Sequence, residues 1–225
     1  NNQTLLCMEL ARGDLVTYFN KENNTDQSLL AKFRILSDVA AGLHYLHHVA
    51  NPRIIHMDLK FNNILWFNDT PHRFKITDFG FAQMMGTGVI TADGQPRTPP
   101  AYLAPEQIGT GRMDMKGDVL ALGVLLFELI TGRQPFAPFP LVSNLEDLRR
   151  AVRDAVPLKA SECLNTLPKA QLTGIALARR VDPARLLQLL EVHFDGLLMR
   201  TVQKQPHTRP ESLLVVAEAL QGYLK

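Results

Sequence analysis

The longest apolar run of the chain is VLALGVLLFELI, at residues 119–130, and it limits the kind of fold that the chain can adopt. A membrane-spanning helix needs roughly 20 apolar residues, whereas this run is shorter and is interrupted by Gly123 and Glu128. We therefore expect a helix inside a folded domain, with Gly132 as its C-cap. In a chain of 225 residues that is 46% hydrophobic, one large core is the default arrangement.

Charge and cysteine content exclude several classes of function. The 24 basic and 22 acidic residues are interspersed and give a formal net charge of +2, so no polycationic face for nucleic acid is expected. Cys7 and Cys163 lack CxxC spacing, which argues against a zinc site or a disulfide framework and fits a reducing compartment. We expect a cytoplasmic protein with no nucleic-acid partner and no membrane span. Because TLLCMEL is typical of a strand, we expect the sequence to begin inside a folded region.

Helical periodicity predicts a mainly α fold with a few short β-strands. Apolar residues recur every three to four positions over residues 27–49, which predicts a helix with one buried face. These residues are Leu29, Phe33, Leu36, Ala40, Leu43 and Leu46. Gly13 and Asp14 suit a turn and a helix cap. Further helices are expected at about 145–156, 186–203 and 211–224, with short strands beside loops in RIIHMDLKFNNILWF and RFKITDFGFA. Residues 157–185 are ambiguous.

The stretch IIHMDLKFNNIL places polar residues at fixed offsets inside an apolar frame. Phosphoryl transfer needs a carboxylate that orients the attacking hydroxyl, a cation on the moving phosphoryl group, and oxygen ligands for magnesium. Asp58 can orient the hydroxyl, Lys60 can reach the γ-phosphate, and Asn63 offers a carbonyl oxygen to the metal. Asp78, in DFG, offers a carboxylate to the same metal, and Gly80 gives the backbone freedom beside it.

These segments, in this order, resemble the C-terminal lobe of a eukaryotic-type protein kinase. CMELARGDL resembles the hinge, GLHYLHHVANPRIIHMDLKFNNIL the catalytic loop and the helix leading to it, and KITDFG the magnesium-binding segment. AYLAPE resembles the end of the activation segment, GDVLALGVLLFELITGRQPF the central buried helix, and HTRP the late arginine motif. Their joint occurrence is highly specific. It implies a partial kinase domain over residues 1–225, with the hinge at about 7–14, the catalytic loop at 56–63 and the activation segment at 78–106.

The resemblance implies ATP and Mg²⁺ (or Mn²⁺) as cofactors. It makes Asp58 and Lys60 the catalytic residues and makes Asn63 and Asp78 the metal ligands. The residues that it assigns to cofactor binding are Met8, Glu9, Ala11, Asp14, Lys60, Asn63, Leu65 and Asp78. Those that it assigns to structure or regulation are His56, Met57, Phe79, Gly80, Thr98, Glu106, Asp118 and Arg209.

The resemblance also implies specific contacts and a substrate. Asp118 is expected to accept backbone hydrogen bonds from the catalytic loop. Glu106 is expected to pair with Arg209, and His56 to stack with Phe79. Lys60, two places after Asp58, belongs to the serine/threonine variety of the pattern, so the expected partner is a protein substrate with a Ser or Thr acceptor.

Three departures from the family pattern stand out. The sequence contains no glycine-rich loop, strand lysine or glutamate partner before the hinge, so we expect little activity from this chain alone. RTPPAYLAPE has one residue more than usual between Thr98 and Tyr102, which leaves the register of Thr98 open. The stretch at 157–185 is longer than expected, which indicates an insertion that is either a surface for a regulatory partner or a tolerated loop.

Met57 stands where other members carry an arginine that binds the activation-segment phosphate bidentately. A thioether fills apolar gaps and cannot make that pairing. The hypothesis is that this activation segment is ordered without phosphate, or by a partner.

Two other functions remain open. A pseudokinase or scaffold would keep the fold without catalysis, but it has no chemical need for Asp58, Lys60, Asn63 and Asp78 together. A small-molecule kinase of the aminoglycoside or choline type also fits His-x-Asp-x-x-x-x-Asn, but APE, GDVLALG and HTRP argue against it. The His44, His47 and His48 spacing suits a helical metal site, yet the kinase resemblance already accounts for GLHYLHH.

Overall fold

A computed structural model of the chain describes residues 9–20, 28–67, 73–79, 98–109, 114–136 and 144–224. The strand expected at about 4–10 lies mostly outside this part, as do Met8, Gly80 and most of the activation segment. The statements below concern the described residues.

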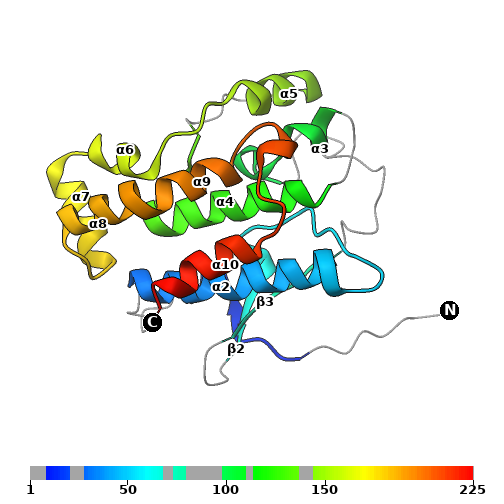
Figure 1. Cartoon of the computed structure of the whole chain (residues 1–225), viewed down its shortest axis with the longest axis horizontal. Helices are drawn as coiled ribbons and strands as arrows, with labels where there is room; N and C mark the ends of the chain where they lie inside the picture. Colours follow the sequence, from blue (N-terminus) through cyan, green and yellow to red (C-terminus); the bar gives the residue numbers. More distant parts are fainter. Residues whose placement is uncertain are drawn as a thin grey trace.

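The described part is mainly helical with one small sheet, as the sequence predicts (Figure 1). The α-helices are α1 (Leu15–Asn20), α2 (Leu29–His44), α3 (Pro105–Gly109), α4 (Met115–Thr131), α5 (Leu145–Asp154), α6 (Ala160–Asn165), α7 (Lys169–Ala178), α8 (Pro183–Leu189), α9 (Asp195–Thr201) and α10 (Leu214–Gly222). Short 3₁₀ or π turns are η1 (Tyr45–Val49), η2 (Phe61–Asn63), η4 (Pro100–Tyr102), η5 (Leu190–Phe194) and η6 (Pro206–Thr208). The strands are β1 (Gly13–Asp14), β2 (Ile64–Phe67) and β3 (Arg73–Ile76). Within this part no helix combines the length and the apolar character that crossing a bilayer would require.

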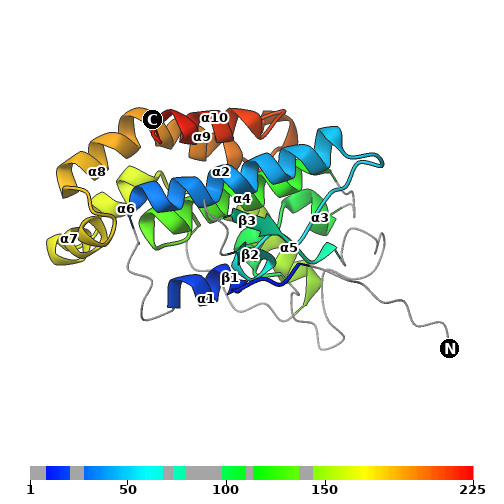
Figure 2. The ribbon, with the colours of Figure 1, turned by 90° about the horizontal axis from the view of Figure 1, so that it is seen from below.

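Helix α4 runs through the centre of the helical layer and is buried on nearly every side (Figures 1 and 2). Asp114 caps its N-terminus by accepting a hydrogen bond from the Lys116 amide at 3.0 Å. Gly132 ends it in the left-handed conformation, with φ 72°, which confirms the predicted C-cap. A helix that is apolar all round has to be enclosed by other elements, and α4 is the core around which they pack.

Helix α2 presents its predicted apolar stripe to this core. Leu29, Phe33, Leu36, Ala40 and Leu43 are all buried, and Leu46 is half-buried in the π turn that continues the helix to Val49. Ser28 caps the start of α2 by accepting a hydrogen bond from the Ala31 amide at 3.2 Å. α2 lies between α10 on one side and β3 on the other, so it joins the helical layer to the sheet (Figure 2).

The sheet brings three distant segments together. Its strands are antiparallel in the order β1–β2–β3, with Asp14 opposite Leu65 and Ile64 opposite Ile76. β1 ends at Asp14, β2 begins directly after Asn63, and β3 ends two residues before Asp78. The register therefore gathers at one place residues that the sequence assigns to nucleotide and metal binding.

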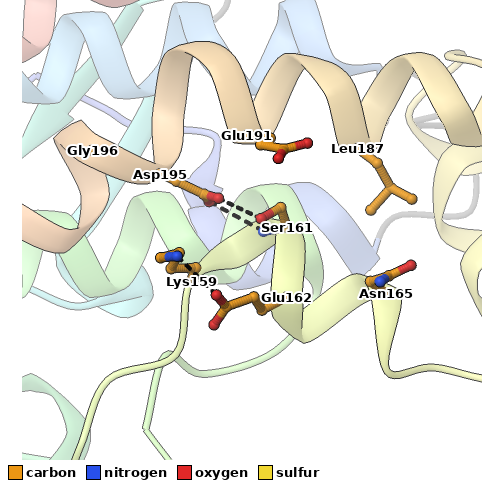
Figure 3. Close-up of a pocket in the computed structure, with 8 residues that line it drawn as sticks. All are labelled: Lys159, Ser161, Glu162, Asn165, Leu187, Glu191, Asp195 and Gly196. Carbon is orange, nitrogen blue, oxygen red and sulfur yellow. Dashed lines mark hydrogen bonds and ion pairs between the residues drawn. The ribbon is translucent and has the colours of Figure 1, made fainter.

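The ambiguous stretch at 157–185 is helical. α6 is held by Asp195, which accepts hydrogen bonds from the Ser161 amide at 3.1 Å and from the Ser161 hydroxyl (Figure 3). Lys159, the N-cap residue just before α6, pairs with Glu162 of that helix at 2.8 Å (Figure 3). The helix expected at 186–203 begins earlier, at Pro183, and consists of α8, η5 and α9.

Candidate active site

The catalytic-loop segment is fixed to the core helix by one buried carboxylate. Asp118 of α4 accepts hydrogen bonds from the backbone amides of His56, at 2.8 Å, and Met57, at 2.7 Å. These are the contacts that the sequence predicts. His47 Nε2 bonds to the same carboxylate at 2.8 Å, a contact that sequence reasoning missed because it considered His47 only within a histidine triplet. The sequence did carry a signal for this contact. His47 follows the predicted buried Leu43 by four residues, so it lies on the same helix face, and a buried histidine needs a polar partner.

His56 connects the loop to the segment that carries Asp78. Its ring is fully buried, with Nε2 bonded to the Thr77 carbonyl at 2.8 Å and Nδ1 3.3 Å from the Asp58 amide. The carbonyl can only accept and the amide can only donate, so this geometry assigns the neutral tautomer with its proton on Nε2. The ring also meets Phe79 edge-on, with centroids 5.4 Å apart, as the expected stacking requires.

Three donors converge on Asp58. Its carboxylate is 1% exposed, and Oδ2 accepts hydrogen bonds from Lys60 Nζ at 2.7 Å and from Asn63 Nδ2 at 3.0 Å. Oδ1 accepts a hydrogen bond from Thr98 Oγ1 at 2.5 Å. A buried carboxylate needs such donors to remain stable, and their number fixes its orientation.

The Thr98 contact answers the question of its register. The residues between Thr98 and Tyr102 lead into the 3₁₀ turn η4, where the Tyr102 amide donates to the Pro99 carbonyl at 2.9 Å. Thr98, just before this turn, reaches Asp58.

Asn63 and Asp78 carry the oxygen atoms that suit a hard divalent cation. Asn63 Nδ2 donates to both the carbonyl and the carboxylate of Asp58, which turns Oδ1 to the other side of the amide. That oxygen has no hydrogen bond within the described part and is not among the fully buried, unpaired atoms there. Asp78 is exposed. A carboxylate and an amide oxygen fit Mg²⁺, which also retains water ligands.

Two residues of the site have left-handed backbone conformations. Met57 has φ 70° and Asp78 has φ 62°. Non-glycine residues at such angles are uncommon, and they persist where the surroundings determine them. Here the Asp118 bond to the Met57 amide supplies one such constraint.

The expected nucleotide side is described in part. Asp14 Oδ1 accepts a hydrogen bond from the Thr17 amide at 2.8 Å, and Oδ2 accepts one from Asn62 Nδ2 at 3.2 Å. Burial raises the pKa of Asp14, but the hydrogen bonds from Thr17 and Asn62 outweigh it and leave the pKa below its usual value. Leu65 lies opposite Asp14 in the sheet. Ala11, three residues before Asp14, is half-buried, whereas the exposed Glu9 side chain pairs with Lys75.

The end of the activation segment is fixed by a buried ion pair. Arg209 Nη2 donates to Glu106 Oε2 at 3.1 Å, and Nη1 donates to Oε1, so the predicted pair is present and bidentate. The same guanidinium group donates to the carbonyls of Lys116 at 2.7 Å, Gln203 at 2.6 Å and Lys204 at 3.0 Å. The arginine therefore ties α3 to α4 and to the segment before η6.

A model of the protein kinase domain matches residues 1–221. The chain belongs to the protein kinase family. Similar proteins of Arabidopsis thaliana include a receptor-like serine/threonine-protein kinase, with 39% identity over 58% of this chain and 36% of the relative. Calmodulin-binding receptor-like cytoplasmic kinase 2 is 35% identical over 60% of this chain and 33% of the relative. MDIS1-interacting receptor like kinase 1 is 37% identical over 65% of this chain and 14% of the relative. The chain therefore matches at most about a third of the length of these relatives.

In this kinase domain Met57 is held by its backbone. Its amide bonds to Asp118, its carbonyl lies 3.4 Å from Gln107 Nε2, and its side chain is half-buried. The methionine therefore leaves the loop anchorage intact.

The histidine triplet of the kinase domain has other contacts. His44 and His48 have ring centroids 4.9 Å apart, His44 Nδ1 lies 3.1 Å from Ser212 Oγ, and His47 is bonded to Asp118. Burial, reinforced by the neighbouring histidines, lowers the pKa of His48. No group of three His, Cys, Asp or Glu side chains in the described ranges could hold a metal ion.

Proposed function

We propose that the intact protein transfers the γ-phosphoryl group of ATP to Ser or Thr hydroxyls of protein substrates. The observation that carries this proposal is the arrangement around Asp58, where a lysine, an asparagine and a threonine all bond to one buried carboxylate. The Ser/Thr preference is supported by Lys60 and by the names of the relatives.

Asp58 is proposed to orient the substrate hydroxyl and to accept its proton. Thr98 and Asn63 hold the carboxylate in one orientation, so little reorganisation is needed when the hydroxyl arrives. Lys60 lies on the same loop, with its ammonium group 2.7 Å from Oδ2, and is proposed to neutralise charge on the moving phosphoryl group.

Asn63 Oδ1 and the Asp78 carboxylate would hold Mg²⁺ (or Mn²⁺), and Asp14, Ala11 and Leu65 would face the nucleotide. The metal, when bound, supplies positive charge at the phosphate oxygens. Met8, the Glu9 carbonyl and Gly80 complete this proposed set. A cytoplasmic location, and an activation segment ordered without phosphate or by a partner, belong to the same proposal.

The test is phosphotransfer from radiolabelled ATP to a Ser/Thr peptide by the natural full-length protein. Asp58→Asn keeps the shape and the acceptor for Thr98 but removes the proton acceptor, so kcat should fall at least 100-fold. Glu146→Gln, an exposed change on α5, is the matched control and should leave kcat unchanged. Activity of Asp58→Asn equal to the natural protein would contradict the proposed role. Inactivity of the natural protein itself would favour a scaffold.

A further inference from the structure

Lys204 places an ammonium group where few neighbours stabilise its charge. The residue lies between α9 and η6 and is half-buried. Its Nζ lies 3.8 Å from the centroid of the Phe136 ring, and Phe136 is itself buried. In the described ranges no carboxylate pairs with Lys204 and no oxygen atom accepts a hydrogen bond from Nζ. Nζ is not one of the fully buried, unpaired atoms there, so solvent reaches it.

A second cation, the guanidinium group of Arg209, faces Lys204. Like charges repel, so Arg209 acts against the protonated form of Lys204. A guanidinium group has five N–H donors, and all five are engaged here. Two bond to Glu106, and the others bond to the carbonyls of Lys116, Gln203 and Lys204 itself. Arg209 is therefore fixed beside Lys204 and has no donor left for a further ligand.

These surroundings favour the neutral amine. Burial, reinforced by the Arg209 guanidinium group, lowers the pKa of Lys204 to about 8. The Phe136 ring acts in the opposite direction, because the face of an aromatic ring attracts a cation. A ring does not, however, replace the hydrogen bonds that an ammonium group makes in water. A neutral lysine amine is a nucleophile, and desolvation or a neighbouring cation activates lysine in this way.

The neighbours of Lys204 also select the class of electrophile, through the charge of the product. An aldehyde would form an imine, and the protonated imine keeps a cation beside Arg209. Carbon dioxide would form a carbamate, whose negative charge would lie against the negative face of the Phe136 ring and would find no free N–H group on Arg209. An acyl donor forms a neutral amide, which is compatible with both neighbours.

We propose that Lys204 is a modification site that is acylated by an acyl-coenzyme A thioester. The neutral Nζ attacks the carbonyl carbon of the thioester, a nitrogen–carbon bond forms, and the carbon–sulfur bond breaks. The coenzyme leaves as a thiolate, which takes up the proton that Nζ loses, so no oxidant or reductant is needed. The amide removes one of the two cations beside the Glu106–Arg209 pair, which fixes the end of the activation segment.

The test is the rate at which acetyl-coenzyme A acetylates Lys204 in the natural full-length protein, measured by mass spectrometry of its peptides. An unstructured peptide with one lysine reacts in the same tube as the reference. An ordinary lysine has a pKa of about 10.4, so at pH 7.5 the neutral fraction of Lys204 is roughly 200-fold larger. Half burial and the weaker basicity of the amine offset part of this gain. Lys204 should therefore react at least 10-fold faster than the peptide.

The dependence on pH and on folding gives two further checks. The rate at Lys204 should reach half its maximum near pH 8 and then level off, whereas the rate of the reference peptide should keep rising to pH 10. The advantage of Lys204 should disappear in concentrated guanidinium chloride, because it depends on burial and on the fixed position of Arg209. Equal rates for Lys204 and the peptide in the folded protein, or an advantage that persists after unfolding, would overturn the proposal.

A pair of variants isolates the contribution of the ring. Phe136→Leu keeps an apolar neighbour but removes the face that attracts the cation, so the rate at Lys204 at pH 7.5 should rise by about 2-fold or more. Phe67→Leu is the matched control, because Phe67 is also buried and lies under a different ammonium group, that of Lys75. It should leave the rate at Lys204 unchanged. A rate that falls in Phe136→Leu but not in Phe67→Leu, with both variants folded, would overturn the proposal.

Discussion

The catalytic-loop segment at 54–63 and the helical stretch at 157–185 differ in how they are held. The first has little regular secondary structure, yet its polar groups bond to partners far along the chain, in α4 and at Thr98. The second is largely α-helical. Its α7 exposes 75% of Leu177 and packs mainly against the adjacent α8, whereas Arg179, just after α7, donates to the Ile130 carbonyl of α4 at 3.1 Å. We therefore expect buried long-range bonds, more than the regular hydrogen bonds along a helix, to determine how firmly each part of a segment is fixed.

Asp118→Ala should have the largest effect of the changes that test this comparison. It leaves His47 Nε2 and the amides of His56 and Met57 without their buried acceptor. Each such orphaned donor costs about 1–3 kcal/mol, so the free energy of unfolding should fall by roughly 3 kcal/mol or more. Equilibrium denaturation in urea measures this, and a loss below about 1 kcal/mol would show that the loop is held by other contacts.

Thr98→Val should have the next largest effect, because it removes one donor from Asp58 while keeping the shape of the side chain. Hydrogen bonds to charged groups contribute about 1.5–3 kcal/mol, so a loss of that size is expected. Thr173→Val, on the exposed side of α7, is the matched control and should change the unfolding free energy by less than about 0.5 kcal/mol. The comparison would fail if the two variants unfolded at the same urea concentration.

Asp182→Ala probes a local helix cap in the stretch at 157–185. Asp182 caps α8 by accepting hydrogen bonds from the amides of Ala184, at 2.9 Å, and Arg185, at 3.2 Å. Loss of such a cap costs about 1 kcal/mol. Hydrogen exchange should show the added opening confined to α7 and α8, and faster exchange in the catalytic loop would mean that the regions are coupled.

Leu177→Glu should have the smallest effect. The leucine is mostly exposed, so the change removes little buried apolar area and should alter the unfolding free energy by no more than about 0.5 kcal/mol. Differential scanning calorimetry at constant pH measures it. A large destabilisation would show that α7 is covered by something in solution.

Part of the fold and of the candidate site could be predicted from the sequence. Helices α2 and α4 carry strong periodic or continuous apolar patterns, and both were predicted with their burial or caps. The Glu106–Arg209 and Asp118 contacts came from the order of the family motifs. Apolar periodicity is a local property of the sequence, and the motifs have a fixed order along the chain, so both can be recognised without a structure.

Other features depend on three-dimensional placement. The His47 bond to Asp118 and the Thr98 bond to Asp58 join residues that only packing brings together. α6 has six residues, too few for a periodic pattern, and the apolar residues of α7 are spread around its axis. The contact between Lys204 and Phe136 could not be predicted either, because the two residues are far apart in the sequence.

The left-handed backbone at Met57 restricts which amino acids can replace it. A φ of 70° disfavours side chains branched at Cβ, such as valine, isoleucine and threonine, but accepts long unbranched ones, whether neutral or cationic. The two bonds that hold this residue use its amide and its carbonyl, not its side chain. A single substitution here therefore adds or removes a charge next to Asp58 while the backbone bonds that hold the loop stay the same. Under the proposed function, the residue that the hypothesis links to control and the residue proposed for catalysis are adjacent, and the first can change without the second.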